Sequence, residues 1–436
     1  MLLLRKAGAA TKEAKAPMLP ISNFAVPPGS VDAAALARSV SAPAMLQAFQ
    51  RFLPPRDRTA WEACELARVR YVPGKSWHVL YRLWRSGQLA SAEPTYFYCE
   101  FLPPSRALRR FIELRGHGGA TAPSGFVAEL DMLYWHFPAD PQLEQLPTLY
   151  RDGSWRVVSY VPGTTCVLSG ERDGQPCILK LYADDRVERV GLVIEALRAS
   201  GLSAPHVLQV DHERRLLLLE HVPGVLFWSN PLVHLERDVV GAMAREAARL
   251  HATQPPESTL GILPRVAHAQ LEWQRFQRAK EELASVFPAL APRLDRLSSM
   301  LGPLAVESPV VLLHGSFHPA QFLIANGAPR LIDFDAVCLG DPMYDLARFA
   351  SHLYDMGQVN GQEIGRIEKA VSAFRSAYVT SSGSQFDASR WFWFLAVALV
   401  SKRARQVLKR LEVDAENLVR HLLNIAEQNA VSILRT

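Results

Sequence analysis

The sequence predicts an α+β fold of two lobes, in which a β-rich half precedes a helical half. Short apolar runs of β-type patterning, separated by Pro-Gly and Asp-Gly turns, fill much of residues 59–225. Helical spacing after Ser30 is broken once, at Pro43, and residues 151–225 are expected to form a five-stranded sheet with one helix. Helical apolar spacing dominates residues 226–436, where the predicted helices include 265–302 and 388–411, and one short β-rich stretch interrupts it between residues 310 and 335. The dipeptide Pro223-Gly224 lies where the pattern changes and is the natural boundary between the lobes.

Length and composition limit the classes of function. A chain of 436 residues exceeds the usual size of one domain, so two or three compact units are expected. The net charge of +5 is small for this length and argues against a dedicated nucleic-acid binder. Five dispersed cysteines without a CxxC pair indicate free thiols, and no apolar run is long enough for a bilayer span. We therefore expect a cytoplasmic protein without nucleic-acid or membrane partners.

A repeated pattern links residues 59–150 to the segment that follows. A strand, a Pro-Gly turn, a second strand and a third strand surround Tyr71, and the same order returns around Tyr160. We interpret the first unit as a degenerate duplicate of the second, with chance recurrence of hairpin chemistry as the alternative. When the third strands are aligned, Glu100 falls where the second copy has Lys180. The first copy then lacks the cation that a phosphate site needs, and we expect it to be structural.

The most informative stretch runs from Val310 to Phe349, VVLLHGSFHPAQFLIANGAPRLIDFDAVCLGDPMYDLARF. It contains H-G-S-x-H-P-x-Q, a short hairpin, I-D-F-D, and G-D-P-x-x-D-L in that order. This order and spacing resemble the aminoglycoside phosphotransferase family, whose members carry H-G-D-x-H-x-x-N/Q, I-D-F/W-D/E/G and G-D-P-x-x-D-L/A. The resemblance implies a two-lobed protein-kinase-like fold that binds ATP or GTP and Mg²⁺ between its lobes.

The resemblance also implies a division of the chain into four segments. Residues 1–58 are expected to be a flexible leader and a helical extension, and residues 59–150 an additional N-terminal β unit. Residues 151–225 then form the nucleotide-binding N-lobe and hinge. Residues 226–436 form the helical C-lobe with the catalytic and metal loops.

The candidate metal ligands lie around the motif I-D-F-D. Asp333 ends the short apolar strand RLID, where backbone pairing can fix a carboxylate. We interpret it as the principal Mg²⁺ ligand, because Mg²⁺ prefers oxygen ligands in phosphoryl-transfer sites; a strand-end turn aspartate is the alternative. Gln321 lies one short loop upstream and is either a neutral second ligand or a surface glutamine. Asp335 is a candidate ligand of a second ion.

The candidate phosphate ligand is Lys180, which ends the apolar strand PCILK. A lysine in an otherwise buried strand needs an anionic partner. The resemblance implies that Glu195, one helix later, holds Lys180 against the α- and β-phosphates of the nucleotide. Glu188 is the rival for this role.

Two further segments complete the nucleotide site by resemblance. The turn that contains Gly163, Thr164 and Thr165 is expected to cover the phosphates with backbone N–H groups. The hinge EHVPGV, which begins with Glu220 and includes Val222, is expected to pair with the purine through its backbone.

The helix that follows G-D-P is expected to support the catalytic loop. Asp341 and Pro342 are typical of an N-cap and a first helical position, and Asp345 lies in the first turn. We expect both aspartates to brace the loop rather than to take part in catalysis.

The sequence departs from the family pattern at Ser316, where the family carries its catalytic aspartate. Serine cannot act as a carboxylate base near neutral pH, and such a base typically contributes about 10²- to 10⁴-fold in rate. Metal and positioning contribute most of the stabilisation in phosphoryl transfer, so slow catalysis is compatible with the sequence. The candidate catalytic residues are His314, Ser316 and His318. Ser316 would position the acceptor hydroxyl, and His318, Asp335 or the acceptor itself would take the proton.

Three functions are compatible with this pattern. The first is a small-molecule kinase that phosphorylates a hydroxyl group, and the second is a pseudokinase that binds nucleotide and regulates or scaffolds a partner protein. The third is a binding module without nucleotide. The joint presence of Lys180, Glu195 and Asp333 disfavours the third function, and the intact metal and phosphate residues favour the enzyme.

A basic segment near the C-terminus bears on the acceptor. It contains Lys402, Arg403, Arg405, Lys409 and Arg410. It is either a solvated helix face or an indication of an anionic or neutral substrate or of a partner, because polycationic acceptors would call for acidic residues.

Overall fold

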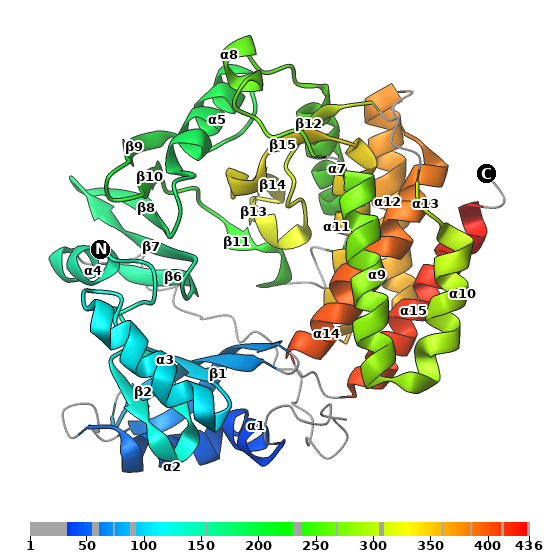
Figure 1. Ribbon diagram of the computed structural model, residues 1–436. Coiled ribbons are helices and arrows are strands. Elements are labelled where there is room, and N and C mark those ends of the chain that lie inside the picture. Colours follow the sequence, from blue (N-terminus) through cyan, green and yellow to red (C-terminus); the bar gives the residue numbers. More distant parts are fainter. Residues whose placement is uncertain are drawn as a thin grey trace.

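The computed structural model of the chain consists of two five-stranded β-sheets and a helical lobe, and loops with two small sheets lie between the second five-stranded sheet and the helices (Figure 1). The predicted leader, residues 1–30 of the segment 1–58, lies outside the described residues. Among the helices that are described, none combines the length and apolar character needed to cross a bilayer. The structure describes residues 33–54, 61–72, 75–87, 93–153, 155–229, 235, 237–266, 268–304, 309–359, 361–383, 386–410 and 414–433.

The N-terminal part is an antiparallel five-stranded sheet with helices on both faces. Helices α1 (Ala33–Ser39) and α2 (Ala42–Phe52) pack on one face, and α3 (Pro104–His117) packs on the other against Leu133 and Trp135. The strand order is β1-β2-β3-β5-β4, with β1 (Trp61–Val72), β2 (Ser76–Arg85), β3 (Thr95–Phe101), β4 (Gly125–Val127) and β5 (Met132–His136). The sequence pattern revealed only the first three of these strands.

The N-lobe is a second antiparallel sheet, and it confirms the predicted five strands and one helix. Helix α4 (Leu146–Asp152) precedes it, and α5 (Val187–Ala199) follows its third strand. The strand order is β6-β7-β8-β10-β9, with β6 (Arg156–Val161), β7 (Thr165–Arg172), β8 (Gln175–Tyr182), β9 (Val207–Asp211) and β10 (Leu216–Glu220).

The two sheets share strand order, direction and the position of one helix after the third strand. Their register is shared as well. Tyr71 pairs with Trp77 of the second strand, which pairs with Phe101 of the third strand. In the same way, Tyr160 pairs with Cys166, which pairs with Leu181. Glu100 and Lys180 directly precede Phe101 and Leu181 and therefore occupy equivalent positions, which confirms the predicted alignment. The duplication itself stays a prediction.

The loops between the lobes carry two small sheets. The hinge strand β11 (Val225–Leu226) pairs with β13 (Phe322–Ala325), which pairs with β14 (Ala328–Leu331). Strand β12 (Val311–Leu313) pairs with β15 (Cys338–Gly340), so the predicted β-rich stretch extends beyond residue 335. These pairs fix the two ends of the H-G-S and I-D-F-D loops.

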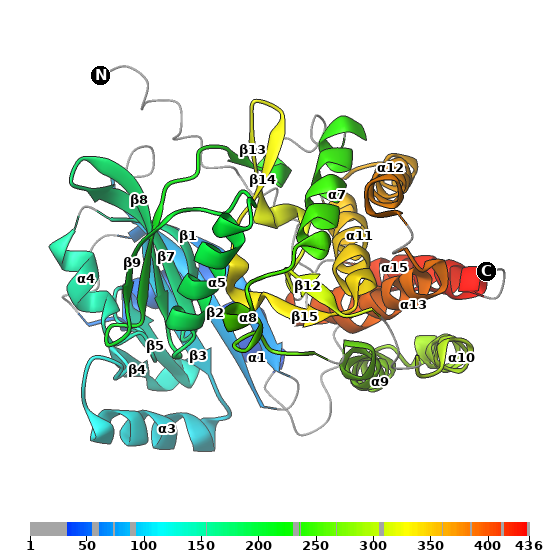
Figure 2. The same ribbon diagram turned by 90° about the horizontal axis from the view of Figure 1, so that it is seen from above.

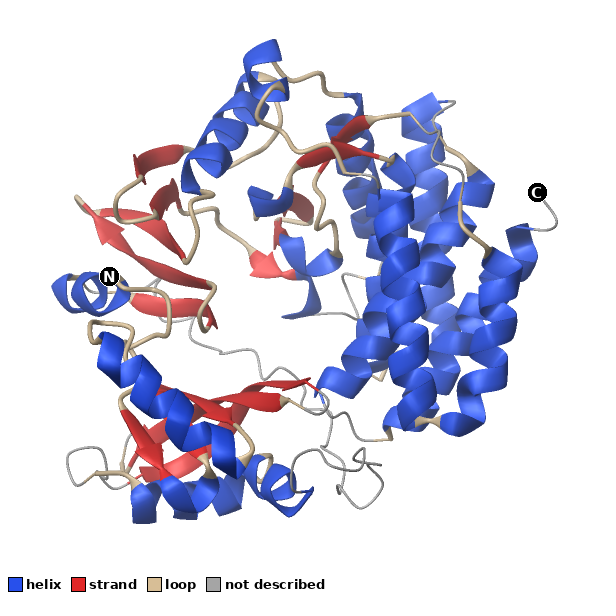
Figure 3. Cartoon of the chain, viewed as in Figure 1, coloured by secondary structure: helices blue, strands red, loops and turns tan. Residues whose placement is uncertain are grey.

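The C-lobe is a bundle of helices on the side of the molecule opposite the sheets (Figures 2 and 3). One apolar core joins it to α5 of the N-lobe and includes Ile194, Phe276 and Phe349. The helices are α7 (Arg237–Ala252), α8 (Glu257–Leu260), α9 (His268–Val286), α10 (Ala291–Leu301), α11 (Pro342–Val359), α12 (Ile364–Ser382), α13 (Ala388–Ala398), α14 (Arg405–Arg410) and α15 (Ala415–Ile433).

Three predicted helices have different boundaries in the structure. The break expected at Pro43 lies at Ser41, which caps α2 through Ala44 N, because proline is tolerated in a first helical turn. The single helix expected over 265–302 is divided into α9 and α10 at Pro288, which cannot continue a helix. The helix expected over 388–411 contains a π-helical segment, Leu399–Ala404.

Candidate active site between the two lobes

The loop after β14 presents two carboxylates toward the N-lobe. Asp333 has a left-handed backbone conformation, with φ 67° and ψ 64°, which L-residues rarely adopt. Asp335 follows within a one-turn 3₁₀ helix, Phe334–Ala336. Strained backbone of this kind concentrates at functional sites. From this turn both carboxylates reach the same lysine.

That lysine is Lys180 of β8, and it joins the two lobes. Its Nζ lies 2.6 Å from Oδ1 of Asp333 and 2.6 Å from Oδ1 of Asp335. The Lys180 side chain is only 10% exposed, whereas that of Asp333 is 36% exposed. The buried lysine thus has the anionic partners that its strand position predicted, and one carboxylate remains accessible.

The surroundings give the two carboxylates different pKa values. Burial would raise the pKa of Asp333, but the Lys180 ammonium outweighs burial and holds this pKa at about 2. Burial raises the pKa of Asp335 above its ordinary value, because Lys180 offsets only part of the effect. Tyr182 also donates a hydrogen bond of 3.0 Å from its hydroxyl to Asp335 Oδ1.

The oxygen atoms around Asp333 fit a magnesium site. Gln321 donates from Nε2 to Asp333 Oδ2 at 2.7 Å, which brings its amide group beside the carboxylate. Within the described part of the chain, no cluster of three or more His, Cys, Asp or Glu side chains could hold a metal ion. Mg²⁺ does not need such a cluster, because it commonly binds one or two carboxylates together with substrate phosphates. The residues present therefore fit Mg²⁺ bound with a nucleotide.

The catalytic loop is held by Asp345 of α11. Asp345 accepts from the backbone N–H groups of His314 at 2.7 Å and Gly315 at 3.1 Å, and it is fully buried. A Cβ atom on Gly315 would lie 2.0 Å from the carbonyl oxygen of Ala336, so only glycine allows the two loops to touch. The predicted bracing role of Asp345 is confirmed. Asp341 caps α11 through Met343 N, as predicted.

A comparison with protein families agrees with this geometry. Residues 164–392, more than half of the chain, match the model described as the phosphotransferase enzyme family, APH. The chain belongs to this family. The match begins at Thr164 in the N-lobe, so the first sheet and its helices lie outside it.

Several solved structures resemble this phosphotransferase in fold. An ethanolamine kinase of Plasmodium vivax is 15% identical over 64% of this chain and 84% of its own, with a TM-score of 0.45. A putative aminoglycoside phosphotransferase of Ralstonia eutropha is 15% identical over 75% and 98%, with a TM-score of 0.49. A macrolide 2′-phosphotransferase of Brachybacterium faecium is 18% identical over 63% and 96%, with a TM-score of 0.42. No curated protein matches the chain.

In this phosphotransferase, the predicted partner of Lys180 is corrected. Glu195 lies on the outer side of α5, where its Oε1 accepts from Val207 N at 3.1 Å. The rival Glu188 pairs with His212 at 2.7 Å instead. The helix contributes Arg189, which donates to the carbonyl oxygen of Asp335 at 3.3 Å. Helical spacing alone could not show that the position facing the metal loop is an arginine.

The predicted phosphate-covering turn also differs from expectation. The N–H of Gly163 donates to Asp140 Oδ2 at 2.9 Å, and the N–H of Thr164 donates to Val161 O at 3.0 Å. Thr165 begins β7. The N–H groups of Gly163 and Thr164 are therefore engaged within the protein, and a nucleotide would meet the turn by other atoms.

Asp140 is a buried residue that the sequence reasoning missed. It is 0% exposed, and it also accepts from Tyr160 Oη at 2.8 Å and from the backbone of Gln142 and Leu143. It thereby ties the linker between the sheets to the Gly163 turn. The bonds to Gln142 and Leu143 are local, but Tyr160 and Gly163 belong to the β6–β7 hairpin, and the residues around Asp140 carry no signal for that contact.

The hinge residues differ in exposure, and the N–H groups of Glu220 and His221 donate to His206 O at 3.0 Å and to Pro176 O at 3.3 Å. Glu220 ends β10 with a side chain 47% exposed, and Val222 is half-buried. Gly224 has φ 145°, and a Cβ there would lie 3.0 Å from Leu323 of β13. The hinge therefore packs closely against the β13–β14 hairpin, which leads into the loop of Asp333 and Asp335.

The three predicted catalytic residues lie in different environments. His314 is fully buried, with Nε2 3.0 Å from Ile332 O, so its ring supports the loop. Ser316 is half-buried, and its Oγ accepts from Arg348 at 3.3 Å. Burial, followed by the charge of Arg348, lowers the pKa of His318 to about 3. His318 is therefore neutral at pH 7.

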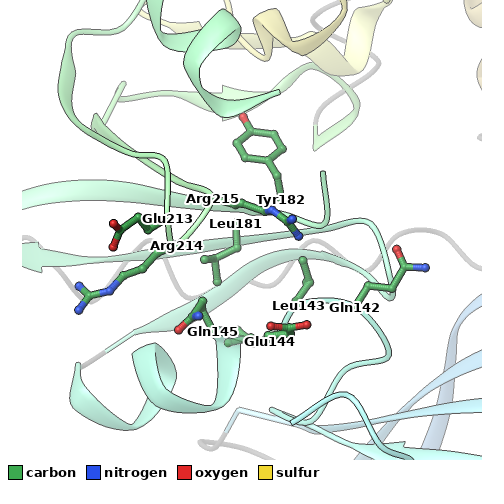
Figure 4. A pocket seen from close by; sticks show the side chains of 10 residues that line it. Gln142, Leu143, Glu144, Gln145, Leu181, Tyr182, Glu213, Arg214 and Arg215 are labelled. Atoms are coloured by element: carbon green, nitrogen blue, oxygen red, sulfur yellow. The ribbon is translucent and has the colours of Figure 1, made fainter. Parts of the chain in front are cut away.

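A separate small pocket lies on the other side of the N-lobe sheet (Figure 4). It is lined by residues 142–146 of the linker, by Leu181 and Tyr182, and by residues 213–215 of the β9–β10 turn. Its volume of about 130 Å³ is small beside the roughly 300–1,000 Å³ of typical ligand pockets. The Tyr182 ring points away from the other side chains that line the pocket, and its hydroxyl donates a hydrogen bond to Asp335. The pocket is therefore separate from the candidate active site.

Proposed function

We propose that the chain transfers the γ-phosphoryl group of ATP or GTP to a hydroxyl group of a small molecule, with Mg²⁺ as the cofactor. The observation that carries this proposal is the contact of Lys180 from the β-rich lobe with Asp333 from the helical lobe at 2.6 Å. An ammonium and an accessible carboxylate at one point between two lobes supply the charges that a metal–nucleotide complex requires. Membership of the phosphotransferase family supports the same chemistry.

Each residue has a separate task in this proposal. Asp333 and Gln321 hold Mg²⁺, which when bound neutralises phosphate charge, and Asp335 is available to a second ion. Lys180 orients the phosphates, and the backbone around Glu220 and Val222 binds the purine. The free thiols of the five cysteines support a cytoplasmic location.

Removal of the proton from the acceptor hydroxyl is the step for which the sequence has no obvious base. Ser316 positions the acceptor hydroxyl but cannot accept its proton as a carboxylate would. Of the two protein alternatives, Asp335 has a raised pKa and His318 a pKa lowered to about 3. Asp335 is therefore the stronger base, and turnover is expected to be slow.

Nucleotide binding tests the first part of the proposal. Mg·ATP at millimolar concentration is expected to raise the melting temperature of the purified chain, and Asp333→Ala is expected to abolish the shift. The same variant without nucleotide should remain folded, which circular dichroism can verify. The absence of any shift in the wild-type chain would refute both the kinase and the pseudokinase.

A pseudokinase is the second candidate, and the serine at position 316 favours it. ADP release in the presence of alcohols, sugars and aminosugars separates the two functions. Release that depends on the acceptor supports the kinase. Binding of Mg·ATP without release by the wild-type chain, together with release by Ser316→Asp, would show that the chain is a pseudokinase that lacks only its base.

A further inference from the structure

Arg348 of α11 lies directly beside the serine of the catalytic loop. Its guanidinium donates to Ser316 Oγ at 3.3 Å, to Gly315 O at 3.5 Å and to Tyr344 Oη at 3.0 Å. It therefore borders the place where Ser316 would position the acceptor. A positively charged guanidinium at this point attracts acceptors that carry a negative charge.

The Arg348 charge has no carboxylate partner among the ion pairs of the described residues. Its three hydrogen-bond acceptors are neutral, two of them at 3.3 Å or more, and its Nε is buried without an acceptor. Hydrogen bonds between charged groups are shorter and about twice as strong as neutral ones. A carboxylate or phosphate group would therefore bind Arg348 better than its present partners do.

The residues near Arg348 include two histidines and a second arginine. His318 stacks on His352 of α11, with ring centroids 4.6 Å apart. Arg403 is 5% exposed, and its nearest carboxylate, Asp355, lies 3.4 Å away. Burial, then Arg403, His318, Arg410 and Arg348 in combination, lower the pKa of His352 well below its ordinary value. Arg348 and Arg403 thus both lie near the two stacked histidines, and Asp355 offsets the charge of Arg403.

The first two cations of the basic segment after α13, Lys402 and Arg403, do not lie on a solvated helix face. The π-helical segment Leu399–Ala404 turns Lys402 inward, where Nζ lies 3.1 Å from Tyr344 Oη and 3.1 Å from Glu272. The same segment buries Arg403. π-helical turns are rare and frequently occur at functional sites. Both cations pair with carboxylates of the protein, Glu272 and Asp355, and the interpretation of the segment as an indication of an anionic or neutral substrate or of a partner stays a prediction.

The N-terminal sheet adds positive charge at the edge of this region. Strand β1 contacts α14, which ends in Lys409 and Arg410 (Figure 1). Burial, then Arg405 and more weakly Arg70 of β1, lower the pKa of Lys409. Glu282 lies among these cations and pairs with Arg405 at 2.5 Å, so their charge is partly compensated within the protein.

We propose that the acceptor carries an anionic group, a carboxylate or a phosphate, which binds Arg348 beside Ser316. This inference rests on the proposed function. The anion pairs with the planar guanidinium, which matches the geometry of both groups. Arg348 supplies the positive charge, and Ser316 aligns the acceptor hydroxyl.

A purely structural role of Arg348 makes a different prediction. If Arg348 only supports the loop through Gly315 O, its replacement should reduce activity equally with neutral and anionic acceptors. If it binds the anion, the replacement should affect anionic acceptors selectively. The ratio of the two effects therefore separates the roles, and it does not depend on the absolute activity.

Matched acceptors provide the test. Glycerol, glycerate and glycerol 3-phosphate share one skeleton, as do glucose, glucuronate and glucose 6-phosphate. Binding of each to the full chain with Mg·ADP is measured by calorimetry, and ADP release from Mg·ATP is measured in parallel. We expect the anionic members to bind at least about 10-fold more tightly than the neutral ones. The carboxylate and phosphate arms identify which anion is preferred.

Two variants and a control complete the test. Arg348→Gln should reduce the preference for anionic acceptors by about 10- to 100-fold, and Arg348→Lys should restore part of it. Arg296→Gln, an exposed arginine of α10, should leave it unchanged. Mg·ATP should raise the melting temperature of all three variants, which verifies that each is folded.

The outcomes separate this inference from the proposed function. Failure of Mg·ATP to bind would refute the proposed function. If nucleotide binds but no anionic member of either set binds more tightly than its neutral partner, the inference is wrong and the function stands. An equal loss for all acceptors in Arg348→Gln would also overturn the inference.

Discussion

The two five-stranded sheets have the same topology but different chemistry at the equivalent position. Lys180 contacts two carboxylates of the helical lobe, whereas Glu100 lies beside a pocket of the N-terminal unit. Burial raises the pKa of Glu100, against the charge of Arg110. The pocket has a volume of about 470 Å³, and its lining includes Lys75, Arg106, Arg109 and Arg110. The same strand topology thus carries a carboxylate at this position in the first sheet and an ammonium group in the second.

A sheet of this topology does not by itself bring a lysine to the two carboxylates. Lys180 of the second sheet faces the loop of Asp333 and Asp335, which belongs to another part of the chain 153 residues away in sequence. The first sheet faces α14 through β1 and has no such loop opposite Glu100 among the described residues. The Lys180–Asp333 contact, on which the proposed function rests, therefore depends on the juxtaposition of a strand and a distant loop.

The largest effect is expected for substitutions at the two equivalent positions, Lys180 and Glu100. Lys180→Ala should weaken Mg·ATP binding by about 100-fold or more, because a charge-assisted contact to phosphate is lost. Glu100→Ala should change it by less than about 2-fold, since Glu100 is not part of the nucleotide site. Calorimetric titration of both variants with Mg·ATP provides the measurement. A comparable loss in both would mean that the first sheet takes part in nucleotide binding.

A second pair of substitutions tests whether the sheets are independent. Leu217 and Leu133 are fully buried and pair with Lys180 and Glu100, respectively. Replacement of either by alanine should cost about 2–5 kcal/mol, because each leaves a cavity. Denaturant unfolding measures this cost. Leu217→Ala should also reduce the melting shift produced by Mg·ATP, whereas Leu133→Ala should retain it.

The pH dependence of stability should differ between the sheets. Burial, with Arg70, lowers the pKa of His78 in the first sheet from 6.5 to about 4. The unfolded chain therefore binds this proton first, so stability present above pH 6.5 is lost as the pH falls toward 4. Asp333 has a lowered pKa of about 2, and its contribution is lost only below about pH 4.

His78→Gln tests this difference. Between pH 7 and pH 5 the wild-type chain should lose about 2 kcal/mol more unfolding free energy than the variant. His318 acts in the same direction in the C-lobe and is present in both chains, so the difference isolates His78. Equal pH dependence of both chains would show that His78 is not held neutral.

The smallest expected effect concerns the link between the sheets. Tyr160→Phe removes the hydrogen bond of 2.8 Å to Asp140 and should cost about 1 kcal/mol. Tyr150→Phe is the control, because the described contacts of Tyr150 involve its ring rather than its hydroxyl. Urea unfolding measures both. A cost as large as that of Leu217→Ala would indicate that Asp140 is essential for the position of the second sheet.

Much of the fold was predictable from local patterns. Alternating and helical spacing placed the five strands and the helix of the N-lobe, and Pro223-Gly224 marked the hinge. The spacing of H-G-S, I-D-F-D and G-D-P identified the family. The last two strands of the first sheet were missed, because β4 has only three residues and β5 is buried at four of its five residues, so neither shows alternation.

The partners of individual side chains were less predictable. Glu195 was expected to meet Lys180, but an unknown rotation of α5 decides which of its residues faces the loop, and that residue is Arg189. Arg348 had no signal at all in the sequence. Its meaning depends on its position beside Ser316, which only the packing of α11 against the catalytic loop determines.

By itself, the sequence determined the order of the elements and the kinds of chemical group in the motifs, because both depend on residues close together in the chain. Tertiary structure alone decided which groups meet: Lys180 with Asp333, Asp140 with Gly163, and Arg348 with Ser316. The physical reason is range. Side-chain patterning acts over a few residues, whereas an ion pair or hydrogen bond of about 3 Å needs the whole path of the chain to bring two distant residues together.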